Sequence, residues 1–459
     1  MDTKKLRQKI LDLAIRGKLV PQDPNDEPAS VLLERIRAQK ERLIAEGKIK
    51  RPKKSKASSS ESHYQQFEPP FEIPDSWVWT TLGEIFSMQA GKNIQASGLQ
   101  GYSKEAPYPC YGGNGIRGYL PKYSHHGTFP IIGRQGALCG NIKVASGFFY
   151  ATEHAVIVDY FAGTNVDLWT LFLECLNLNQ YATATAQPGL SVAKIEEVPI
   201  PLPPINEQNR IVDRISKWFS TIDIISKNFN DLKLSIVDAK SKVLELAMQG
   251  KLVSQDPSDE PAAEMLKRIN PKARIITDTP HSWNIPQSWG WVKLGDIFNH
   301  NTGKALNSTN KDGIEYEYIT TSNVYWDRFE LSGLKKMFFK DSEIEKCMVK
   351  HGDLLVCEGG DIGRCAIWNF DKDIMIQNHL HRLRPLANEI NPQLYCRLFK
   401  LYKEKGLVGG KGIALQGFSS NALHNLVVPL MAENEQKRIV AKIEELYACL
   451  DKIEASLQS

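Results

Sequence analysis

The sequence LAIRGKLVPQDPNDEPA at residues 13–29 returns as LAMQGKLVSQDPSDEPA at residues 246–262, which lies 233 positions later. Two further anchors repeat in the same order. Ile-Pro-x-Ser-Trp (73–77) with Leu-Gly-x-Ile-Phe (82–86) returns at 285–289 and 294–298, and Pro-Leu (201–202) with Asn-Glu-Gln (206–208) returns at 429–430 and 434–436. Self-similarity that keeps its order over this distance is the signature of a repeated structural unit. The chain is therefore predicted to be a tandem duplication.

Between these anchors, residues 73–205 and 285–433 are rich in glycine, proline, aromatic residues and short β-type runs. The clearest runs are Phe129 to Gly133, Ala155 to Val158 and Asp353 to Val356, and helical stretches follow at Leu168 to Leu178 and Pro392 to Lys403. Short apolar runs bounded by turn residues are typical of strands. We expect two α/β globules of about 130 to 150 residues each, which is an ordinary domain size.

The first copy carries an insertion, because the offset between the copies falls from 233 to 212 after the first anchor. The added residues lie in 48–72, where six basic residues and a serine run precede Pro69 and Pro70. This composition is typical of a solvated linker. It can serve as a tether to the DNA backbone or simply as a solubilising linker, and the sequence leaves both open.

A long helix follows each globule. Apolar residues recur at alternating spacings of four and three, at 211, 215, 218, 222, 225, 229, 232, 236, 239, 243 and 246, and again at 439, 443, 446, 450, 453 and 457. Such a heptad stripe predicts a coiled-coil seam. Leu6, Ile10 and Leu13 match positions 239, 243 and 246 of the repeat, so the N-terminal helix is expected to complete the second rod. The alternative is that each stripe pairs with another molecule.

The expected fold is of the α+β class, with two pseudo-twofold-related α/β domains separated by an antiparallel pair of long coiled-coil helices. The expected division is an N-terminal helical region at 1–47, the linker at 48–72, the first globule at 73–205, a central region with the long helix at 206–284, the second globule at 285–433 and a C-terminal helix at 434–459.

Composition narrows the class of protein. The chain has 459 residues, 42% hydrophobic and 24% charged, which is typical of globular proteins. No apolar run reaches the roughly 18 residues of a membrane span, and the charged N-terminus lacks a secretory core. Eight scattered cysteines without a C-x-x-C pair fit a reducing cytoplasm. With a net charge of only +4, nucleic-acid binding would require local basic surfaces.

Catalytic motifs are missing from the sequence. Gly113, Gly115 and Gly118 spell G-x-G-x-x-G, but the flanking prolines predict a glycine-rich loop rather than the strand and helix of a dinucleotide site. No Gly-Lys pair is followed by Ser or Thr, so there is no Walker A motif. The histidine pairs at 125–126 and at 379 and 381 lack a metal-ligand constellation and are read as loop or surface residues. We therefore expect neither catalysis nor a bound cofactor in this chain.

Polar side chains in turn-rich segments suggest double-stranded DNA as the ligand. The candidate contacts are Lys92, Asn93, Tyr111, Asn114, Arg117, Arg134 and Gln135 in the first globule, and Lys304, Thr321, Asn323, Asp361, Arg364 and Asn378 in the second. Arginine can read guanine with two hydrogen bonds, asparagine and glutamine can read adenine, and glycine lets the backbone approach phosphate. Such residues also occupy ordinary turns, and Arg134 and Arg364 could instead be structural arginines paired with carboxylates.

The sequence resembles the specificity subunits of type I restriction–modification enzymes along essentially its whole length. The motifs that carry the resemblance are Leu-Ala-x-x-Gly-Lys-Leu-Val (13–20, 246–253), Pro-x-x-Trp-x-Trp (74–79, 286–291), Gly-Asp-Leu-Leu (352–355) with Ile-Gly-Arg (362–364), and Glu-Gln-x-x-Ile-Val (207–212, 435–440). Met431 and Ala432 stand where the family usually has two prolines, which puts only that turn in doubt.

The resemblance implies two target-recognition domains, each of which reads one half of a bipartite, asymmetric DNA site. It also implies conserved helices that dock two modification subunits, which carry S-adenosylmethionine and methylate adenine, and motor-nuclease restriction subunits that use ATP and Mg²⁺. None of that catalysis would belong to this chain. The alternative from another class is a non-catalytic two-headed scaffold that holds two protein partners.

Overall fold

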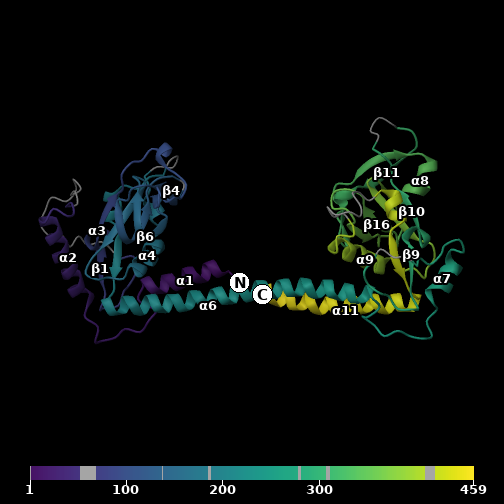
Figure 1. The fold of residues 1–459 in the computed structure, drawn as a ribbon, viewed down its shortest axis with the longest axis horizontal. Helices are drawn as coiled ribbons and strands as arrows, with labels where there is room; N and C mark the ends of the chain where they lie inside the picture. The colour runs from purple at the N-terminus through teal and green to yellow at the C-terminus, as the bar shows by residue number, and fades with distance from the viewer. Residues whose placement is uncertain are drawn as a thin grey trace. The chain divides into compact units, whose positions relative to one another are not determined.

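The computed structural model describes residues 2–51, 69–136, 138–183, 188–277, 281–306, 311–408 and 419–458. Most of the predicted linker at 48–72 lies outside these residues. The chain divides into two compact units, unit 1 (residues 1–228) and unit 2 (residues 229–459). Each unit combines helices with β-sheet (Figure 1).

Unit 1 contains one large sheet. Its helices are α1 (Thr3–Ile15), α2 (Ala29–Ala45), α3 (Leu82–Ile85), α4 (Val166–Cys175), α5 (Val192–Glu196) and the first part of α6 (Ile205–Met248), and its strands are β1 (Val78–Thr81), β2 (Phe86–Ala90), β3 (Tyr108–Gly112), β4 (Gly115–Leu120), β5 (His125–Gly133), β6 (Ile142–Ala151), β7 (Ala155–Tyr160) and β8 (Pro199–Leu202). Six strands pair in the order β2-β7-β5-β6-β3-β4, and β1 pairs separately with β8. Only β3 and β6 run parallel among these six described strands.

Unit 2 repeats this plan with an added sheet. Its helices are the rest of α6, α7 (Ala262–Ile269), α8 (Asp341–Cys347), α9 (Pro392–Glu404), α10 (Ser420–His424) and α11 (Glu433–Gln458), and its strands are β9 (Gly290–Lys293), β10 (Phe298–Thr302), β11 (Ile314–Ile319), β12 (Val324–Tyr325), β13 (Arg328–Phe329), β14 (Lys335–Phe339), β15 (Met348–Val349), β16 (Leu354–Cys357), β17 (Cys365–Ile367), β18 (Ile374–Ile376), β19 (Leu380–Pro385) and β20 (Val427–Leu430). The sheets have the orders β10-β19-β16-β17, β14-β11-β18-β15, β20-β9 and β12-β13.

The two units share a topology, which confirms the duplication and the mixed α and β fold. The order β10-β19-β16-β17 reproduces β2-β7-β5-β6, and the ladder of β9 with β20 reproduces that of β1 with β8. The predicted strands correspond to β5, β7 and β16, and the predicted helical stretches correspond to α4 and α9. The G-x-G-x-x-G segment lies in the β3–β4 hairpin: residues 113–114 form its turn, but Gly115 to Gly118 belong to β4, so the predicted loop is wrong for these residues.

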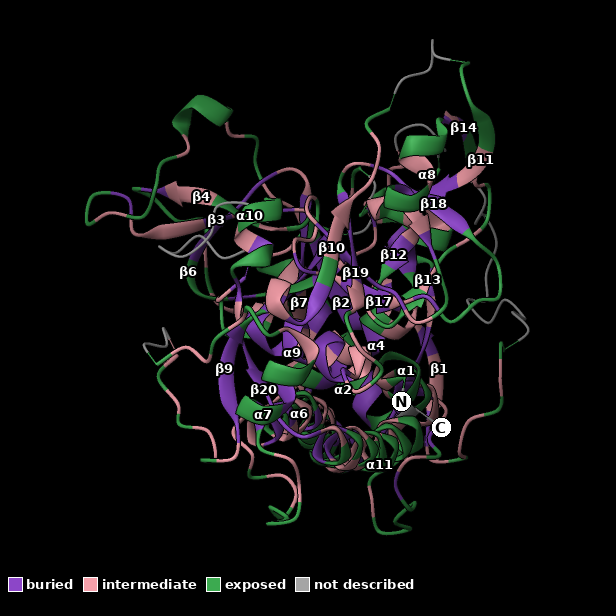
Figure 2. Cartoon of the chain, turned by 90° about the vertical axis from the view of Figure 1, so that its right-hand side faces the viewer, coloured by how far each residue is buried: buried purple, intermediate pink, exposed green. Residues whose placement is uncertain are grey.

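Each unit builds its own core, because helices and strands bury their apolar faces against one another. In unit 1, α4 covers β5 and β6 and buries Trp169 and Phe172. In unit 2, α9 packs on β17 and buries Tyr395 and Phe399. The buried residues, drawn in purple in Figure 2, lie mainly in the strands and on the inner faces of these helices.

The predicted long helix is confirmed as α6, and within each unit a second helix runs antiparallel to it. In unit 1, the guanidinium of Arg7 in α1 lies 4.5 Å from the ring centre of Phe219, while Gln22, which follows α1, bonds to Glu207. In unit 2, Lys240 pairs with Asp451 of α11 at 2.6 Å. The N-terminal half of α6 therefore pairs with α1, and its C-terminal half pairs with α11.

The predicted seam is wrong at every second position in the middle of α6. Ile211, Ile215, Ile222 and Ile236 are buried, but Trp218, Ile225 and Leu232 are 46%, 44% and 41% exposed. The residues that follow these three in sequence, at positions 219, 226 and 233, are half-buried instead. The buried and half-buried positions 215, 219, 222, 226, 229, 233 and 236 keep the alternating spacing of four and three. The contact face therefore has the predicted period, but one of its two rows lies one residue further along the helix.

The repeated Leu-Ala-x-x-Gly-Lys motif forms the joint between helix and globule. Gly17, which follows α1, has a φ of +67°, and a Cβ there would lie 2.5 Å from the Pro74 ring. Gly250 has the same φ, and a Cβ there would lie 2.3 Å from Pro286. Only glycine accepts both the left-handed conformation and this close contact. This contact explains why the segments that contain Gly17 and Pro74 recur together in the second copy.

Candidate nucleic-acid interface

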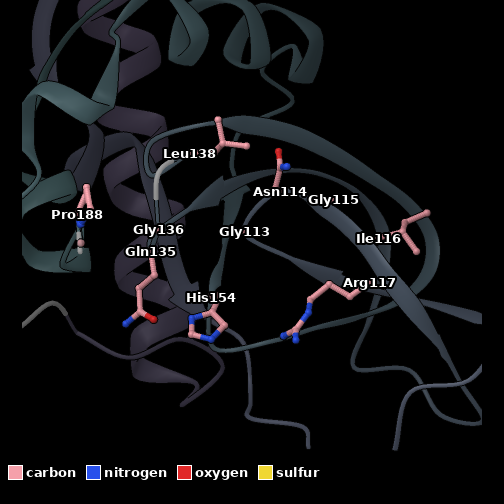
Figure 3. Close-up of a pocket in the computed structure, with 11 residues that line it drawn as sticks. Gly113, Asn114, Gly115, Ile116, Arg117, Gln135, Gly136, Leu138, His154 and Pro188 are labelled. Carbon is pink, nitrogen blue, oxygen red and sulfur yellow. The ribbon is translucent and has the colours of Figure 1, made fainter. Parts of the chain in front are cut away.

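Unit 1 contains an open cavity of about 650 Å³ at the end of its sheet. Its lining comes from the β3–β4 turn, the segment after β5, and the chain around His154 and Pro188. The lining includes three predicted contacts, Asn114, Arg117 and Gln135 (Figure 3). Residues far apart in the sequence thus meet in one concave site, which is where ligands usually bind.

Glycines allow the loops of this cavity to approach one another. A Cβ on Gly133 would lie 2.1 Å from the carbonyl oxygen of Gly113, so neither loop tolerates a side chain there. A Cβ on Gly112 would lie 2.4 Å from Cδ of Arg117. The hydrocarbon stem of Arg117 therefore lies across Gly112, which fixes the direction of the guanidinium.

The polar groups of the cavity differ in how they are engaged. Arg117 is exposed and, among the described residues, forms no ion pair or hydrogen bond. Asn114 accepts a 2.8 Å hydrogen bond from the side chain of Asn141, so its own amide N–H groups remain available. The Gln135 side chain is exposed, and Figure 3 shows it beside His154. The cavity thus presents a free guanidinium and two amides, which is the chemistry that reads base edges.

Four other predicted residues of unit 1 lie outside the cavity lining. Arg134 supports its wall, since its backbone N–H donates to His154 and its carbonyl accepts from Leu190, at 3.0 and 2.8 Å. Its Nε is buried without a hydrogen-bond partner. Tyr111 is half-buried, and burial raises the pKa of its phenol. Lys92 and Asn93 are exposed after β2.

Unit 2 brings Thr321, Asn323 and Arg364 into one cluster. Arg364 precedes β17 and donates a 2.7 Å hydrogen bond from Nη2 to the carbonyl of Thr321. The Asn323 side chain accepts from the backbone of Thr320 at 2.9 Å and donates to the carbonyl of Glu330 at 2.9 Å. These bonds hold the short turn before β12 against β17. The partner of Arg364 here is a carbonyl and not a carboxylate.

The remaining three candidates of unit 2 are engaged within the protein. Lys304 is 10% exposed, pairs with Glu343 at 2.5 Å and donates to the carbonyl of Phe338. Asp361 pairs with Lys403 at 2.6 Å, and Asn378 accepts a hydrogen bond from Gln377. The Lys304 ammonium is thus engaged by a carboxylate and a carbonyl of the protein.

The sequence analysis missed His154 in unit 1 and Tyr325 and Arg328 in unit 2. His154 lines the cavity. Arg328 lies with its guanidinium carbon 4.5 Å from the ring centre of Tyr325, and that of Arg364 lies 5.2 Å from it. None of the three was among the polar side chains in turn-rich segments that the sequence analysis selected. The Tyr-Trp-Asp-Arg turn at 325–328 was the only local clue.

The described residues hold no cluster of three or more potential metal ligands. His381 lies 3.0 Å from His300, and burial, with the neighbouring His381, lowers the pKa of His300 to about 4. His381 is fully buried in β19, so its interpretation as a loop or surface residue is wrong. Across the described ranges, no helix combines the length and apolar character that crossing a membrane requires.

A duplicated fold, with one sheet order used twice and a different polar cluster on each copy, defines a protein of two related α/β domains. The sequence model of the family described as "Type I restriction modification DNA specificity domain" matches residues 74–234 and again 286–459. The chain belongs to this family and is a type I restriction–modification specificity subunit.

Similar proteins agree with this assignment. The chain is 27% identical to the EcoAI type I restriction enzyme specificity subunit of Escherichia coli, over 98% of this chain and 90% of that protein. It is 44% identical to the EcoprrI specificity subunit of the same species, over 36% of this chain and 41% of that protein. A solved structure described as "Structural basis underlying complex assembly and conformational transition of the type I R-M system" has a similar fold, with a TM-score of 0.50 at 17% identity, covering 85% of this chain and 94% of that one.

Proposed function

We propose that each unit of this subunit reads one half of a bipartite double-stranded DNA target. The observation that carries the proposal is the repeat of one sheet order with unlike polar clusters, Asn114–Arg117–Gln135 in unit 1 and Thr321–Asn323–Arg364 in unit 2. One scaffold used twice suits two half-sites along a duplex, and unlike side chains suit an asymmetric target.

The proposed interface keeps most of the predicted contacts. In unit 1 it includes Lys92, Asn93, Tyr111 and Arg134 beside the cavity, and in unit 2 it includes Asp361 and Asn378 beside the Arg364 cluster. Lys304 is left out, because its ammonium is held by Glu343. The recognition domains are taken as residues 73–205 and 285–433, with the remaining segments as the conserved regions.

We also propose that the helical regions dock two modification subunits, and that restriction subunits join this complex in the cytoplasm. S-adenosylmethionine, ATP and Mg²⁺ would then bind to those partners, and adenine methylation and DNA cleavage would be their reactions. The support is the family membership, together with the exposed apolar residues Trp218, Ile225 and Leu232 on α6.

Two measurements test the proposal. The first is the affinity of the full chain with its modification subunits for a duplex over a series of KCl concentrations. A DNA-reading subunit should give a steep linear fall of log K with log salt, because phosphate contacts release counterions. A two-headed protein scaffold, the alternative function, should give a flat line. The second is methylome sequencing of cells that carry the complex, which should return a two-part asymmetric motif.

A further inference from the structure

The β12–β13 hairpin of unit 2 carries an aromatic ring with two arginines beside it. Tyr325 is 37% exposed, and the guanidinium carbons of Arg328 and Arg364 lie 4.5 and 5.2 Å from its ring centre. Both distances fall within the range of a cation–π contact. We call these three residues the arginine–tyrosine stack.

The acids around this stack have other main partners. Asp327 pairs with Arg397, and Asp361 pairs with Lys403. Glu330 accepts a hydrogen bond from the backbone of Ser332, and the pKa of its carboxyl is lowered by Ser332 and, less strongly, by the charge of Arg328. Within the part of the chain that the structure describes, neither Arg328 nor Arg364 forms an ion pair with a carboxylate. Two cations beside one ring repel each other, so an anion placed between them would be stabilised.

The hydrogen-bonding groups around the Tyr325 ring favour a phosphate. Arg364 has committed one N–H of Nη2 to the Thr321 carbonyl, and its Nε is buried, so the pair of N–H groups on Nε and Nη2 is not available to read a base edge. The remaining N–H groups on Nη1 and Nη2 lie beside the same ring as the guanidinium of Arg328. Several oxygens of one phosphate can accept hydrogen bonds from both guanidinium groups.

We infer that the arginine–tyrosine stack binds a phosphate of the DNA backbone and does not read a base. The inference rests on the proposed function and deepens it, because it assigns Arg328 and Tyr325 to the interface and changes the role expected of Arg364. Phosphate contacts set the position of a protein on the duplex and carry no sequence information. Base reading in unit 2 would then fall to other side chains of that unit.

The test uses the full chain with its modification subunits and two duplexes, one with the methylated motif and one with the half-site of unit 2 scrambled. Arg328→Ala should weaken binding to both duplexes by the same factor. It should also lower the slope of log K against log[KCl] by about 0.9 for one lost phosphate contact. Arg328→Lys should restore most of the slope, since it restores the charge. Lys372→Ala removes one exposed, ion-paired cation from residues 285–433 of the same unit and should leave the slope unchanged.

Arg364→Lys and Tyr325→Phe provide a second pair of variants, with thermal unfolding measured on each to verify the fold. Arg364→Lys keeps the charge and Tyr325→Phe keeps the ring. Each variant should therefore keep the ratio of the affinities for the two duplexes. An unchanged salt slope in Arg328→Ala would overturn the inference. So would a loss confined to the duplex with the intact motif, because that result means base reading. If the unmodified complex itself shows no salt-dependent duplex binding, the proposed function fails first.

Discussion

The indole nitrogen of Trp77 donates a 2.8 Å hydrogen bond to a carboxylate oxygen of Glu207, and Trp289 donates to Glu435 at the same distance. The second oxygen of Glu207 accepts from Gln22 at 2.6 Å, and Gln255 bonds to Glu435 in the same way. In each unit, three segments distant in the sequence thus meet on one buried carboxylate: the loop after a helix, the start of the globule and the start of a long helix. The motifs that contain Gln22, Trp77 and Glu207 recur in the second copy because they build the same joint there.

Trp77→Phe should lower the free energy of unfolding of the chain, because it leaves a buried carboxylate oxygen of Glu207 without its donor. The cost of an unsatisfied buried partner is about 1–3 kcal/mol, and more where the group is charged. Trp289→Phe should have a similar cost through Glu435. Urea denaturation of both variants measures these values. Equal stability of variant and unmodified protein would contradict the role given to the joint.

The same carboxylate should make stability depend on pH. Burial raises the pKa of Glu207 from 4.5. The folded state therefore holds the proton more tightly than the unfolded state, and the stabilisation present below the unfolded pKa is lost as pH rises through the folded pKa. Glu207→Gln cannot titrate. The unfolding free energy of the unmodified protein minus that of Glu207→Gln should fall between pH 4.5 and neutrality. The exposed Glu197→Gln is the control and should give a much smaller change.

Gly17→Ala should destabilise the protein more than Gly47→Ala. The two glycines have φ values of +67° and +68°, so both variants bear the cost of a left-handed alanine, about 1–2 kcal/mol. A Cβ on Gly47 would have no atom within 4 Å, whereas a Cβ on Gly17 would meet the Pro74 ring at 2.5 Å. The difference between the unfolding free energies of Gly17→Ala and Gly47→Ala measures the cost of the contact with the Pro74 ring. Equal values would mean that the joint can relax around a methyl group.

Arg117→Ala should weaken binding of the complex to its target duplex by about 1–3 kcal/mol if the guanidinium reads a base. Arg117→Lys keeps the charge but loses the planar fork, so it should keep the salt dependence while losing discrimination in the first half-site. Gly112→Ala should resemble Arg117→Lys, because its Cβ would displace the Arg117 side chain. Filter binding with matched and half-site-scrambled duplexes gives the comparison. Equal losses on both duplexes would make Arg117 a phosphate contact.

Replacing residues 74–200 by the matching segment of a relative should change one half of the methylated motif and leave the other half intact. Each unit has its own core and its own polar cluster, so the two readers should act independently. Methylome sequencing gives the motif directly. A change in both halves would show that the units influence each other.

A fragment of residues 1–233 should form a symmetric dimer, because it spans one repeat of the duplicated chain and a second copy can take the place of the missing repeat. Each large apolar side chain buried between two copies contributes about 1.5–3 kcal/mol. Sedimentation at micromolar concentration measures the association. With modification subunits, the dimer should methylate an inverted repeat of the first half-site. A folded monomer would contradict the dimer, and an asymmetric motif would contradict the symmetry.

Much of the fold follows from local pattern. The repeated anchors at 13–29 and 246–262 required one architecture twice, and the sustained apolar spacing from Ile211 required a long helix. The strand runs around Ile131 and Leu355 were recognisable because turn residues bound them. The contact face of α6 was not recognisable to better than one residue, because which side is covered depends on where α1 and α11 lie.

In the candidate site, too, local sequence predicted some features and the packing of distant segments decided others. The sequence placed Lys92 and Lys304 in turn-rich segments, and in the structure the backbone N–H of each lysine donates to a strand carbonyl, at 3.0 and 3.1 Å. Only the tertiary structure decided that Lys92 is exposed while Lys304 is half-buried and paired with Glu343. Backbone conformation follows from local residue types, whereas the availability of a charge depends on which distant acid the folded chain brings within reach.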